Sequence, residues 1–324
     1  MDRIAEFQHI INKLLKEQNF KRSPEALYAP IDYVMSQGGK RLRPMLTLLA
    51  CDIFDGNIQN ALYPALAIEV FHNFTLVHDD IMDKAPMRRG LETVYKKWNS
   101  DIAILSGDTM FAMAYQFAVK TDPALIPDIL DVFSKTAIEV CEGQQLDMDF
   151  EQLELVTIEN YLRMITLKTA VLLGASLKIG ALTAYADKKA VEEMYEFGIN
   201  LGIAFQLQDD LLDVYGQEDK FGKKNGGDIV SNKKTYLYLK ARELANEQQN
   251  ATLKELYANS SSDAEVKIKK VTDIFNELNI KEEVSKVMSD YYAKSLHHLE
   301  KSSADPVKLS LLKSFANQLY TRSH

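Results

Sequence analysis

Apolar residues recur at helical spacing through most of the chain. Near the amino terminus, Ile4, Phe7, Ile11, Leu14 and Leu15 predict an amphipathic helix over 4–20. The same periodicity predicts further helices over 25–36, 44–54, 61–84, 101–120, 124–150, 158–185, 188–215 and 231–247. The remainder, 251–322, is helical by pattern with weak breaks at 259–262 and 305–306. Because no alternating strand pattern of convincing length occurs, the sequence predicts an all-α protein.

The breaks between these helices carry proline, glycine and basic residues. Pro86 ends the helix over 61–84, because the residue before a proline avoids the helical region, and a basic loop over 87–90 follows. Gly174 and Gly180 fall inside a predicted helix, where they allow close packing. No shift of composition marks a linker, so we expect one domain over 1–324.

Composition supports long helices and a cytoplasmic location. The chain has 14 glycines and 8 prolines among 324 residues, about half of average usage. Its two cysteines, Cys51 and Cys141, form no C-x-x-C pair, which fits a reducing compartment. No secretory signal and no run of about 18 apolar residues is visible, so we expect no membrane span. With a net charge of −8 and no large basic stripe, nucleic acid is an unexpected partner.

The most informative feature is a D-D-x-x-D motif that occurs twice, 130 positions apart. The first aspartate set consists of Asp79, Asp80 and Asp83. The second aspartate set consists of Asp209, Asp210 and Asp213. Within each set the carboxylates can share one helical face, where like charges repel by about a few tenths of a kcal/mol per pair. Hard oxygen ligands suit Mg²⁺. The simplest assembly is two helices that face each other across a cleft and hold a Mg²⁺–polyphosphate cluster.

A solvated helix face is the plain alternative for each aspartate set. Apolar residues interleave with the first set, among them Phe74, Val77 and Ile81, which argues against solvation. Two copies, each at the end of a long apolar helix, favour the functional interpretation further.

Four basic clusters could bind anions, and each has a structural alternative. They are G-G-K-R-L-R-P at 38–44, Arg88-Arg89, Lys168-Thr169, and the glycine- and lysine-rich segment 221–235. Guanidinium groups and glycine N–H groups suit phosphate. The alternatives are a solvated loop, an ion pair with the aspartates, a lysine stem that reaches the surface, and a mobile charged loop.

In this order and combination, the motifs resemble the trans-isoprenyl diphosphate synthases of the farnesyl/geranylgeranyl diphosphate synthase type. The matching motifs, from Gly38 to about Thr235, are G-G-K-R-x-R-P, both D-D-x-x-D sets, R-R-G, G-D at 107–108, G-Q-x-x-D at 143–147, K-T, G-K, G-G-D-I and N-K. The resemblance implies an all-helical isoprenoid synthase fold with a deep central cavity, and a homodimer. It also implies condensation of isopentenyl diphosphate with an allylic diphosphate, with three Mg²⁺ ions bridging both aspartate sets to the allylic diphosphate.

The resemblance further assigns roles to residues of this chain. All six aspartates are expected at the metal, with Asp79, Asp83 and Asp209 as direct ligands. The allylic diphosphate is expected at Arg88, Lys168, Lys223 and Lys233. Isopentenyl diphosphate is expected at Lys40, Arg43, His72 and Arg89. Thr169 and Gln206 match positions near the developing carbocation, Asp147 a position behind the site, and Arg322 the family's basic tail. The expected catalytic residues are Asp79, Asp80, Lys168, Thr169 and Gln206.

The implied reaction needs no nucleophilic side chain. Metal ions and cationic side chains stabilise the departing diphosphate, so that the allylic C–O bond ionises. The C=C of isopentenyl diphosphate attacks the cation, and the released diphosphate takes up the proton that is lost. A closed basic loop keeps water from the cation.

Product length depends on what closes the apolar cavity near the first aspartate set. Phe74 and Phe71 stand five and eight residues before Asp79, so they lie one and two helical turns away, at about 5.4 Å per turn. Thr75 is smaller than the aromatic residue of animal-type farnesyl synthases, and the first motif lacks the insertion of the bacterial farnesyl type. We predict C15–C20 products, with C20 favoured.

Four other functions stay open from the sequence. A longer-chain polyprenyl synthase differs only in the cavity floor. A terpene cyclase shares the fold and the first motif but needs no site for a second diphosphate. A non-catalytic partner subunit of a two-component synthase typically lacks both acidic motifs. A phosphohydrolase could use His78-Asp79, but the further spaced histidines of such a site are missing.

Overall fold

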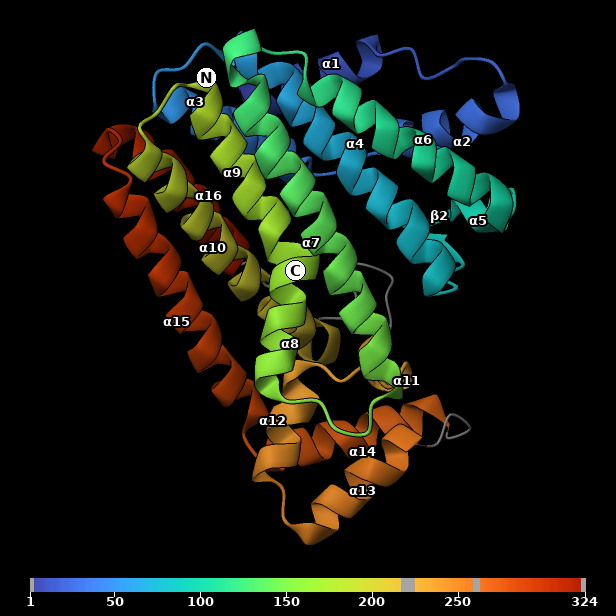
Figure 1. The fold of residues 1–324 in the computed structure, drawn as a ribbon. Coiled ribbons are helices and arrows are strands. Elements are labelled where there is room, and N and C mark those ends of the chain that lie inside the picture. The colour runs from blue at the N-terminus through green and yellow to red at the C-terminus, as the bar shows by residue number, and fades with distance from the viewer. Residues whose placement is uncertain (1–2, 217–224, 259–262, 322–324) are drawn as a thin grey trace. The chain divides into compact units, whose positions relative to one another are not determined.

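The computed structural model describes residues 3–216, 225–258 and 263–321 and consists almost wholly of helices (Figure 1). The predicted all-α class is confirmed. The chain divides into two compact units. Unit 1 comprises Met1–Lys135 and Ala175–Met194, and unit 2 comprises Thr136–Gly174 and Tyr195–His324. The prediction of one domain over 1–324 stays a prediction.

The helices and strands have the following bounds. In the first half they are α1 Arg3–Glu17, α2 Glu25–Ser36, α3 Leu42–Ile53, α4 Ile58–Met82, β1 Met87–Arg88, β2 Leu91–Glu92, α5 Val94–Lys97, α6 Ser100–Ala118, the 3₁₀ turn Pro123–Leu125 and α7 Ile126–Gln152. In the second half they are α8 Ile158–Ile165, the π-helical turn Thr166–Ala170, α9 Val171–Thr183, α10 Lys188–Tyr215, α11 Gly227–Val230, α12 Tyr236–Leu244, α13 Glu247–Ala258, α14 Ala264–Glu277, α15 Ile280–Lys301 and α16 Pro306–Thr321.

Unit 1 is built around α4, which packs against α3 and α6. Leu66, Ile68 and Val70 on α4 are fully buried, because this helix has neighbours on several sides and therefore carries apolar residues all round. Gly180 confirms the predicted close packing, since a Cβ atom there would lie 2.2 Å from the carbonyl oxygen of Thr47 on α3.

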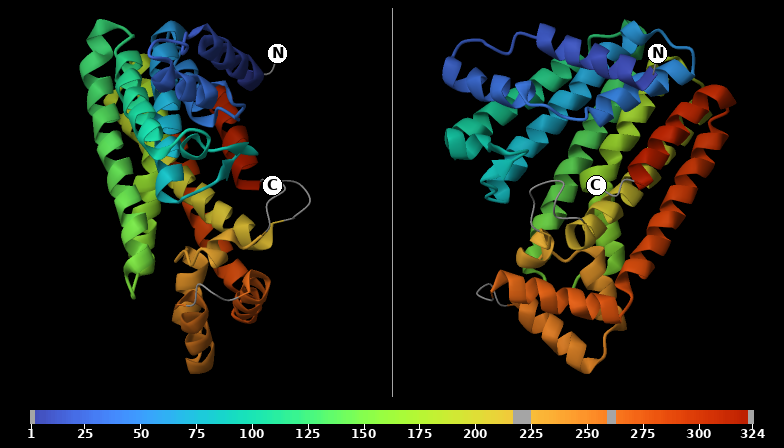
Figure 2. Two further views of the ribbon diagram at one scale, coloured as in Figure 1. Left: turned by 90° about the vertical axis from the view of Figure 1, so that its right-hand side faces the viewer. Right: turned by 180° about the vertical axis from the view of Figure 1, so that it is seen from behind.

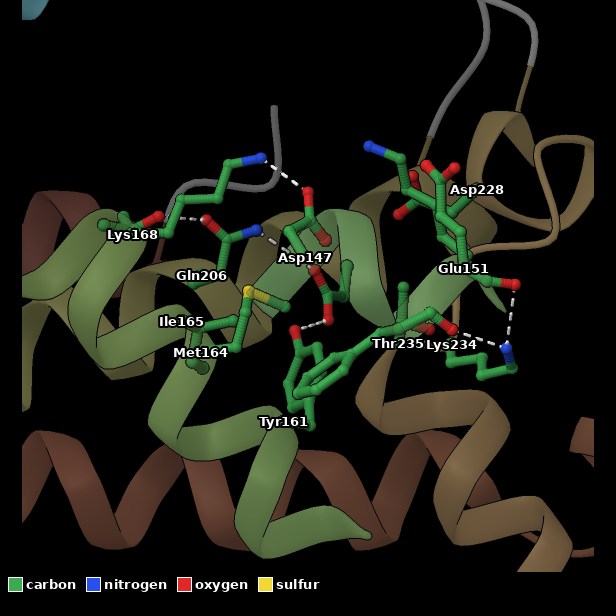
Figure 3. Close-up of a pocket in the computed structure, with 14 residues that line it drawn as sticks. Asp147, Glu151, Tyr161, Met164, Ile165, Lys168, Gln206, Asp228, Lys234 and Thr235 are labelled. Carbon is green, nitrogen blue, oxygen red and sulfur yellow. Dashed lines mark hydrogen bonds and ion pairs between the residues drawn. The ribbon is translucent and has the colours of Figure 1, made fainter. Parts of the chain in front are cut away.

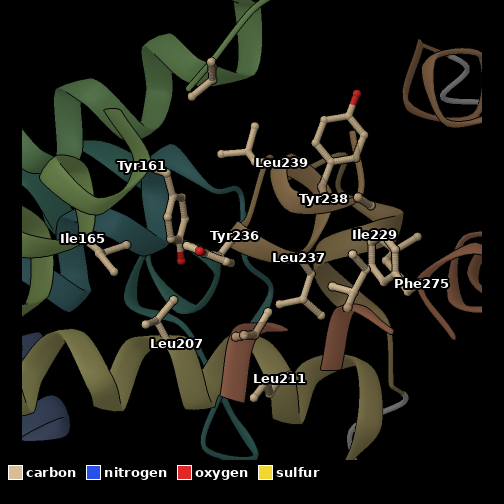
Figure 4. Packing of buried hydrophobic residues seen from close by; sticks show 14 of the residues in the cluster. Tyr161, Ile165, Leu207, Leu211, Ile229, Tyr236, Leu237, Tyr238, Leu239 and Phe275 are labelled. Atoms are coloured by element: carbon tan, nitrogen blue, oxygen red, sulfur yellow. The ribbon is translucent and has the colours of Figure 1, made fainter. Parts of the chain in front are cut away.

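Unit 2 has its own apolar core, which Figure 4 shows in part. Tyr161 and Ile165 from α8, Leu207 and Leu211 from α10, and Phe275 from α14 meet there. The helices α15 and α16 pack side by side (Figure 2). This core supports the segments of unit 2 that carry the candidate site.

Two predicted helices differ from the observed ones in ways that matter for function. The helix predicted over 231–247 begins only at Tyr236, because Asn232 has a left-handed φ of 57° and Thr235 is extended. The helix predicted over 158–185 is interrupted by a π-helical turn. The predicted loop at 87–90 forms a small antiparallel ribbon with Leu91 and Glu92.

One continuous helical stretch among the described residues, Ile158–Thr183, is long and apolar enough to pass a simple test for a membrane span. Of its most apolar window, 67% is buried in the protein. A core helix passes the same test, so the stretch is weak support for a span.

Candidate active site

The first aspartate set lies at the carboxyl end of α4, where Asp83 follows the last helical residue. Carboxylates are unfavourable at this position, because the exposed carbonyl groups of a helix end carry partial negative charge. Asp80 is only 4% exposed, and burial raises its pKa to about 6 while Arg88 opposes the rise. This end of α4 therefore favours the binding of cations.

Arg88, on the ribbon of β1 and β2, is one such cation. Its Nε donates to Asp80 Oδ1 at 2.8 Å, and its Nη2 lies 3.7 Å from Asp79 Oδ2. The ion pair that the sequence offered as an alternative is present. A role for Arg88 at the allylic diphosphate stays a prediction.

Several arginines surround His72 on α4. One contact joins Arg43 Nη1 and His72 Nε2 at 3.3 Å. Burial, followed by the charges of Arg43, Arg89, Arg88 and Arg41, lowers the pKa of His72 well below its usual value. The neutral ring accepts a hydrogen bond from Arg43. Unit 1 thus brings together three of the residues predicted for isopentenyl diphosphate.

The loop that carries Lys40 and Arg43 is built around Arg41, a member of the basic cluster at 38–44 for which no individual role was predicted. Arg41 has a left-handed φ of 48° and is 6% exposed. Its Nη1 lies 2.5 Å from Glu69 Oε1, and its Nη2 donates to two carbonyl groups of the preceding segment. Lys40 itself is exposed. The only sequence signal for the buried pair is one glutamate inside the apolar helix α4.

The predicted chain-length residues belong to an aromatic cluster in unit 1. The ring centroid of Phe74 lies 5.5 Å from that of Phe71 and 5.2 Å from that of Phe111 on α6. Phe133 packs against Phe71 at 5.4 Å. The hydroxyl of Thr75 donates to a backbone carbonyl one turn back at 2.8 Å. Phe111 and Phe133 come from other helices, so spacing along α4 could not reveal them.

His78 fills a packing space between α4 and α6. Its Nε2 lies 3.2 Å from the carbonyl oxygen of Ile104, and a Cβ atom at Gly107 would lie 2.2 Å from that nitrogen. The glycine of the G-D motif at 107–108 is therefore explained by room for the imidazole ring. The phosphohydrolase alternative loses support, because the ring packs against a helix.

The second aspartate set lies near the carboxyl end of α10 in unit 2. Its middle member, Asp210, is 4% exposed, and burial raises its pKa well above the usual value. The hydroxyl of Tyr161 donates to Asp210 Oδ2, and Gln206 Nε2 donates to Oδ1 at 3.2 Å. Asp213 accepts a hydrogen bond from the backbone N–H of Asp228 at 2.9 Å. The set is thereby tied to two neighbouring segments.

Lys168 and Thr169 lie in the π-helical turn, a geometry that recurs at functional sites. Lys168 Nζ lies 2.6 Å from Asp147 Oδ2 on α7. Thr169 donates to Gln206 Oε1 at 3.2 Å. A Cβ atom at Gly143 would lie 2.2 Å from Lys168 N, so the glycine of G-Q-x-x-D lets α7 touch this turn.

These side chains line a pocket of about 100 Å³ in unit 2, shown in Figure 3. Lys168, Thr169, Gln206 and Lys233, four predicted substrate residues, are among its lining. They come from the π-helical turn, from α10 and from the segment before α12.

Some predicted roles are not tested by these positions. Lys223 and Arg322 lie outside the described residues. Within residues 3–216, 225–258 and 263–321, no three His, Cys, Asp or Glu side chains already converge as a metal site. The metal-binding roles of the six aspartates therefore stay predictions.

Comparison with known proteins decides the family. The Polyprenyl synthetase family model matches residues 24–275. The chain belongs to this family. It is therefore a prenyl diphosphate synthase, as the sequence predicted.

Similar proteins carry related names. A geranylgeranyl diphosphate synthase of Methanosarcina mazei is 44% identical over 222 residues, 68% of each chain. A geranylfarnesyl diphosphate synthase of Natronomonas pharaonis is 38% identical over 281 residues, 81% of each chain. A crystal structure of a geranylgeranyl pyrophosphate synthase shares 42% identity, covers 99% of both chains and has a TM-score of 0.94.

Proposed function

We propose that this polyprenyl synthetase is a short-chain trans-prenyltransferase that condenses isopentenyl diphosphate with allylic diphosphates to geranylgeranyl diphosphate. The observation that carries the proposal is the unit 2 pocket, where lysines, a threonine and a glutamine converge beside the second aspartate set. The arginines around His72 in unit 1 supply a second anion site.

The residues present fit Mg²⁺. The donors of both aspartate sets are carboxylate oxygens, which Mg²⁺ prefers, and burial of Asp80 and Asp210 makes their charged forms costly without a cation. Asp79, Asp83 and Asp209 would be direct ligands, with three ions per site as the family resemblance implies. Bound Mg²⁺ supplies charge stabilisation for the departing diphosphate.

The chain's own residues bind and orient the two substrates. Arg88, Lys168 and Lys233 bind the allylic diphosphate, and Lys223 is expected to join them. Lys40, Arg43, His72 and Arg89 hold isopentenyl diphosphate. A neutral His72 suits this task, because Nε2 accepts from Arg43 and the protonated Nδ1 is then the ring's hydrogen-bond donor.

Thr169 and Gln206 act beside the allylic carbocation. Thr169 donates to Gln206 Oε1, and Gln206 in turn donates to Asp210, so the oxygen dipoles of both side chains are fixed before reaction. Fixed dipoles stabilise developing charge without reorganisation. The proton lost after attack passes to the released diphosphate.

We place the product at C15–C20 and favour C20. Phe74 and its aromatic neighbours would form the floor that stops elongation. The relative at 44% identity is named as a C20 synthase, which agrees with the favoured product, whereas the relative at 38% identity is named as a C25 synthase, one prenyl unit longer. A longer-chain product is the second candidate, because the relative at 38% identity is named for a C25 product. We further propose a cytoplasmic homodimer.

The test is product analysis with isopentenyl diphosphate and each of the C5, C10 and C15 allylic diphosphates, with Mg²⁺ and with EDTA. We expect metal-dependent C20 diphosphate from all three primers. Cyclised hydrocarbons, or no condensation, would replace the proposal with a cyclase or an inactive partner subunit.

A further inference from the structure

We propose that Lys234 is a positioning residue, which binds the carboxyl end of α7 and thereby fixes the neighbouring Lys233 at the allylic diphosphate site. This inference rests on the proposed function, in which Lys233 is a diphosphate ligand. Both lysines line the unit 2 pocket, but only Lys233 was predicted to touch substrate. Lys234 would act through its neighbour.

The contacts of Lys234 are with backbone carbonyl groups. Its Nζ donates to the carbonyl oxygen of Phe150 at 2.5 Å and to that of Glu151 at 3.3 Å, and Figure 3 shows Lys234 beside Glu151 with these contacts as dashed lines. The last carbonyl groups of a helix have no partner within it. Here the backbone N–H of Leu153 donates to the carbonyl of Asp149. The next two carbonyl groups, those of Phe150 and Glu151, accept hydrogen bonds from Lys234.

The negative charge near the carboxyl end of α7 favours a cation at this position. Its last turn contains no basic residue, although Asp147, Asp149 and Glu151 stand near its end. A cation stabilises the negative end of a helix. Lys234 supplies that cation from more than 80 residues away in the sequence. The half-buried ammonium group is therefore held at a point that α7 determines.

A second lysine holds the other side of Lys233. Lys267 on α14 is 3% exposed, and its Nζ contacts the side-chain oxygen of Asn232. The backbone N–H of Lys233 itself bonds to the carbonyl of Asp228 at 2.9 Å. Both residues that flank Lys233 are thus bound to different helices, which restricts the backbone from which its side chain extends.

The same end of α7 also carries the partner of Lys168. Asp147 lies one turn before the carbonyl groups that Lys234 binds, and its Oδ2 lies 2.6 Å from Lys168 Nζ. Through α7, Lys234 therefore sets the spacing between two diphosphate-binding lysines, Lys168 and Lys233. A displacement of about 1 Å in such a pair can cost about 100-fold in rate.

The experiment compares steady-state kinetics of the full-length wild type, Lys234→Met, Lys234→Arg and a matched control, Lys240→Met. Lys240 is a partly exposed lysine on α12 that pairs with Glu243 at 3.0 Å. KM and kcat are measured separately for the allylic and the isopentenyl diphosphate, and the melting temperature is recorded.

For Lys234→Met we expect kcat/KM for the allylic diphosphate to fall about 10- to 100-fold, with KM for isopentenyl diphosphate within about twofold of wild type. Lys234→Arg, which keeps the charge and the donors, should restore most of the loss. Lys240→Met should match wild type. Equal kinetics for Lys234→Met and Lys240→Met, or equal changes in both KM values, would overturn the proposal.

A stability effect alone is separated from positioning by the melting temperature. A lower melting temperature with unchanged kinetics would reduce Lys234 to a helix cap and reject the inference. If Lys234→Met does not fold, Lys234→Gln keeps a neutral NH₂ donor but loses the charge, and it must show the same selective loss. An inactive wild type refutes the proposed function, whereas an active wild type with unaffected Lys234 variants refutes only this inference.

Discussion

Gly143 and Lys168 are in direct backbone contact, because a Cβ atom at Gly143 would lie 2.2 Å from Lys168 N and 2.6 Å from its Cα. Gly143→Ala must push α7 and the π-helical turn apart and move Lys168 relative to Asp147. We expect kcat/KM for the allylic diphosphate to fall about 100-fold and the melting temperature to drop. Glu142→Ala, at the exposed neighbouring position, is the control. Wild-type kinetics for Gly143→Ala would contradict the contact.

Tyr161 holds the buried carboxylate of the second aspartate set. Tyr161→Phe removes only the hydroxyl, which leaves one oxygen of Asp210 without its donor. We expect a loss of about 1–3 kcal/mol in the free energy of unfolding, measured by urea denaturation without substrate. Turnover should fall as well, because Asp210 orients Gln206. Tyr236→Phe, on a buried ring 6.3 Å away, is the control and should lower the free energy of unfolding by less. Equal decreases for the two variants would show that Tyr161 does not hold Asp210.

Phe74 should limit product length. Phe74→Ala opens space between α4 and α6, where Phe111 lies 5.2 Å away, so we expect products longer than C20. Chromatography of dephosphorylated products measures this directly. Phe117→Ala, a buried ring that stacks on Tyr63, is the control and should leave the product distribution unchanged. An unaltered product chromatogram for Phe74→Ala would contradict the prediction.

His72 should make the protein sensitive to acid. Its pKa is lowered in the native state, so below about pH 6.5 the unfolded chain binds a proton that native His72 does not. The stability is therefore fully present above that pH. At lower pH the free energy of unfolding decreases by up to about 1.4 kcal/mol per pH unit.

The test compares wild type with His72→Gln in guanidinium unfolding at pH 7.5 and pH 5.5. The variant should lose less stability on acidification than wild type. The exposed His297 provides the control, and His297→Gln should follow wild type. The same pH dependence in all three proteins would show that His72 is protonated in the native state.

Helical periodicity predicted most of the fold, because core helices such as α4 and α10 bury apolar residues at regular spacing. It failed where polar tertiary contacts decide the backbone. The segment 231–235 has residues that tolerate a helix, yet the contact of Lys267 with Asn232 and the left-handed φ of Asn232 hold it out of one. The π-helical turn at Thr166–Ala170 has no sequence signal of its own.

The sequence predicted those residues of the candidate site whose side-chain type indicates a ligand directly. Aspartates and lysines in ordered motifs pointed to diphosphate and metal. Tyr161, Arg41 and Lys234 gave no such signal, because each is an ordinary residue until the fold supplies its partner. Their partners are 49, 28 and 84 residues away along the chain, far beyond the range of local spacing.

The ion pair between Arg88 and Asp80 has a thermodynamic consequence for ligand binding. A diphosphate that takes Arg88 leaves a buried carboxylate without its counter-charge, and a divalent cation that takes the carboxylate releases the guanidinium group. The diphosphate thus removes Arg88, which competes with the cation for Asp80, and the cation removes Asp80, which competes with the diphosphate for Arg88. Affinity for the cation should rise with diphosphate concentration, and by linkage affinity for the diphosphate should rise by the same factor with the cation.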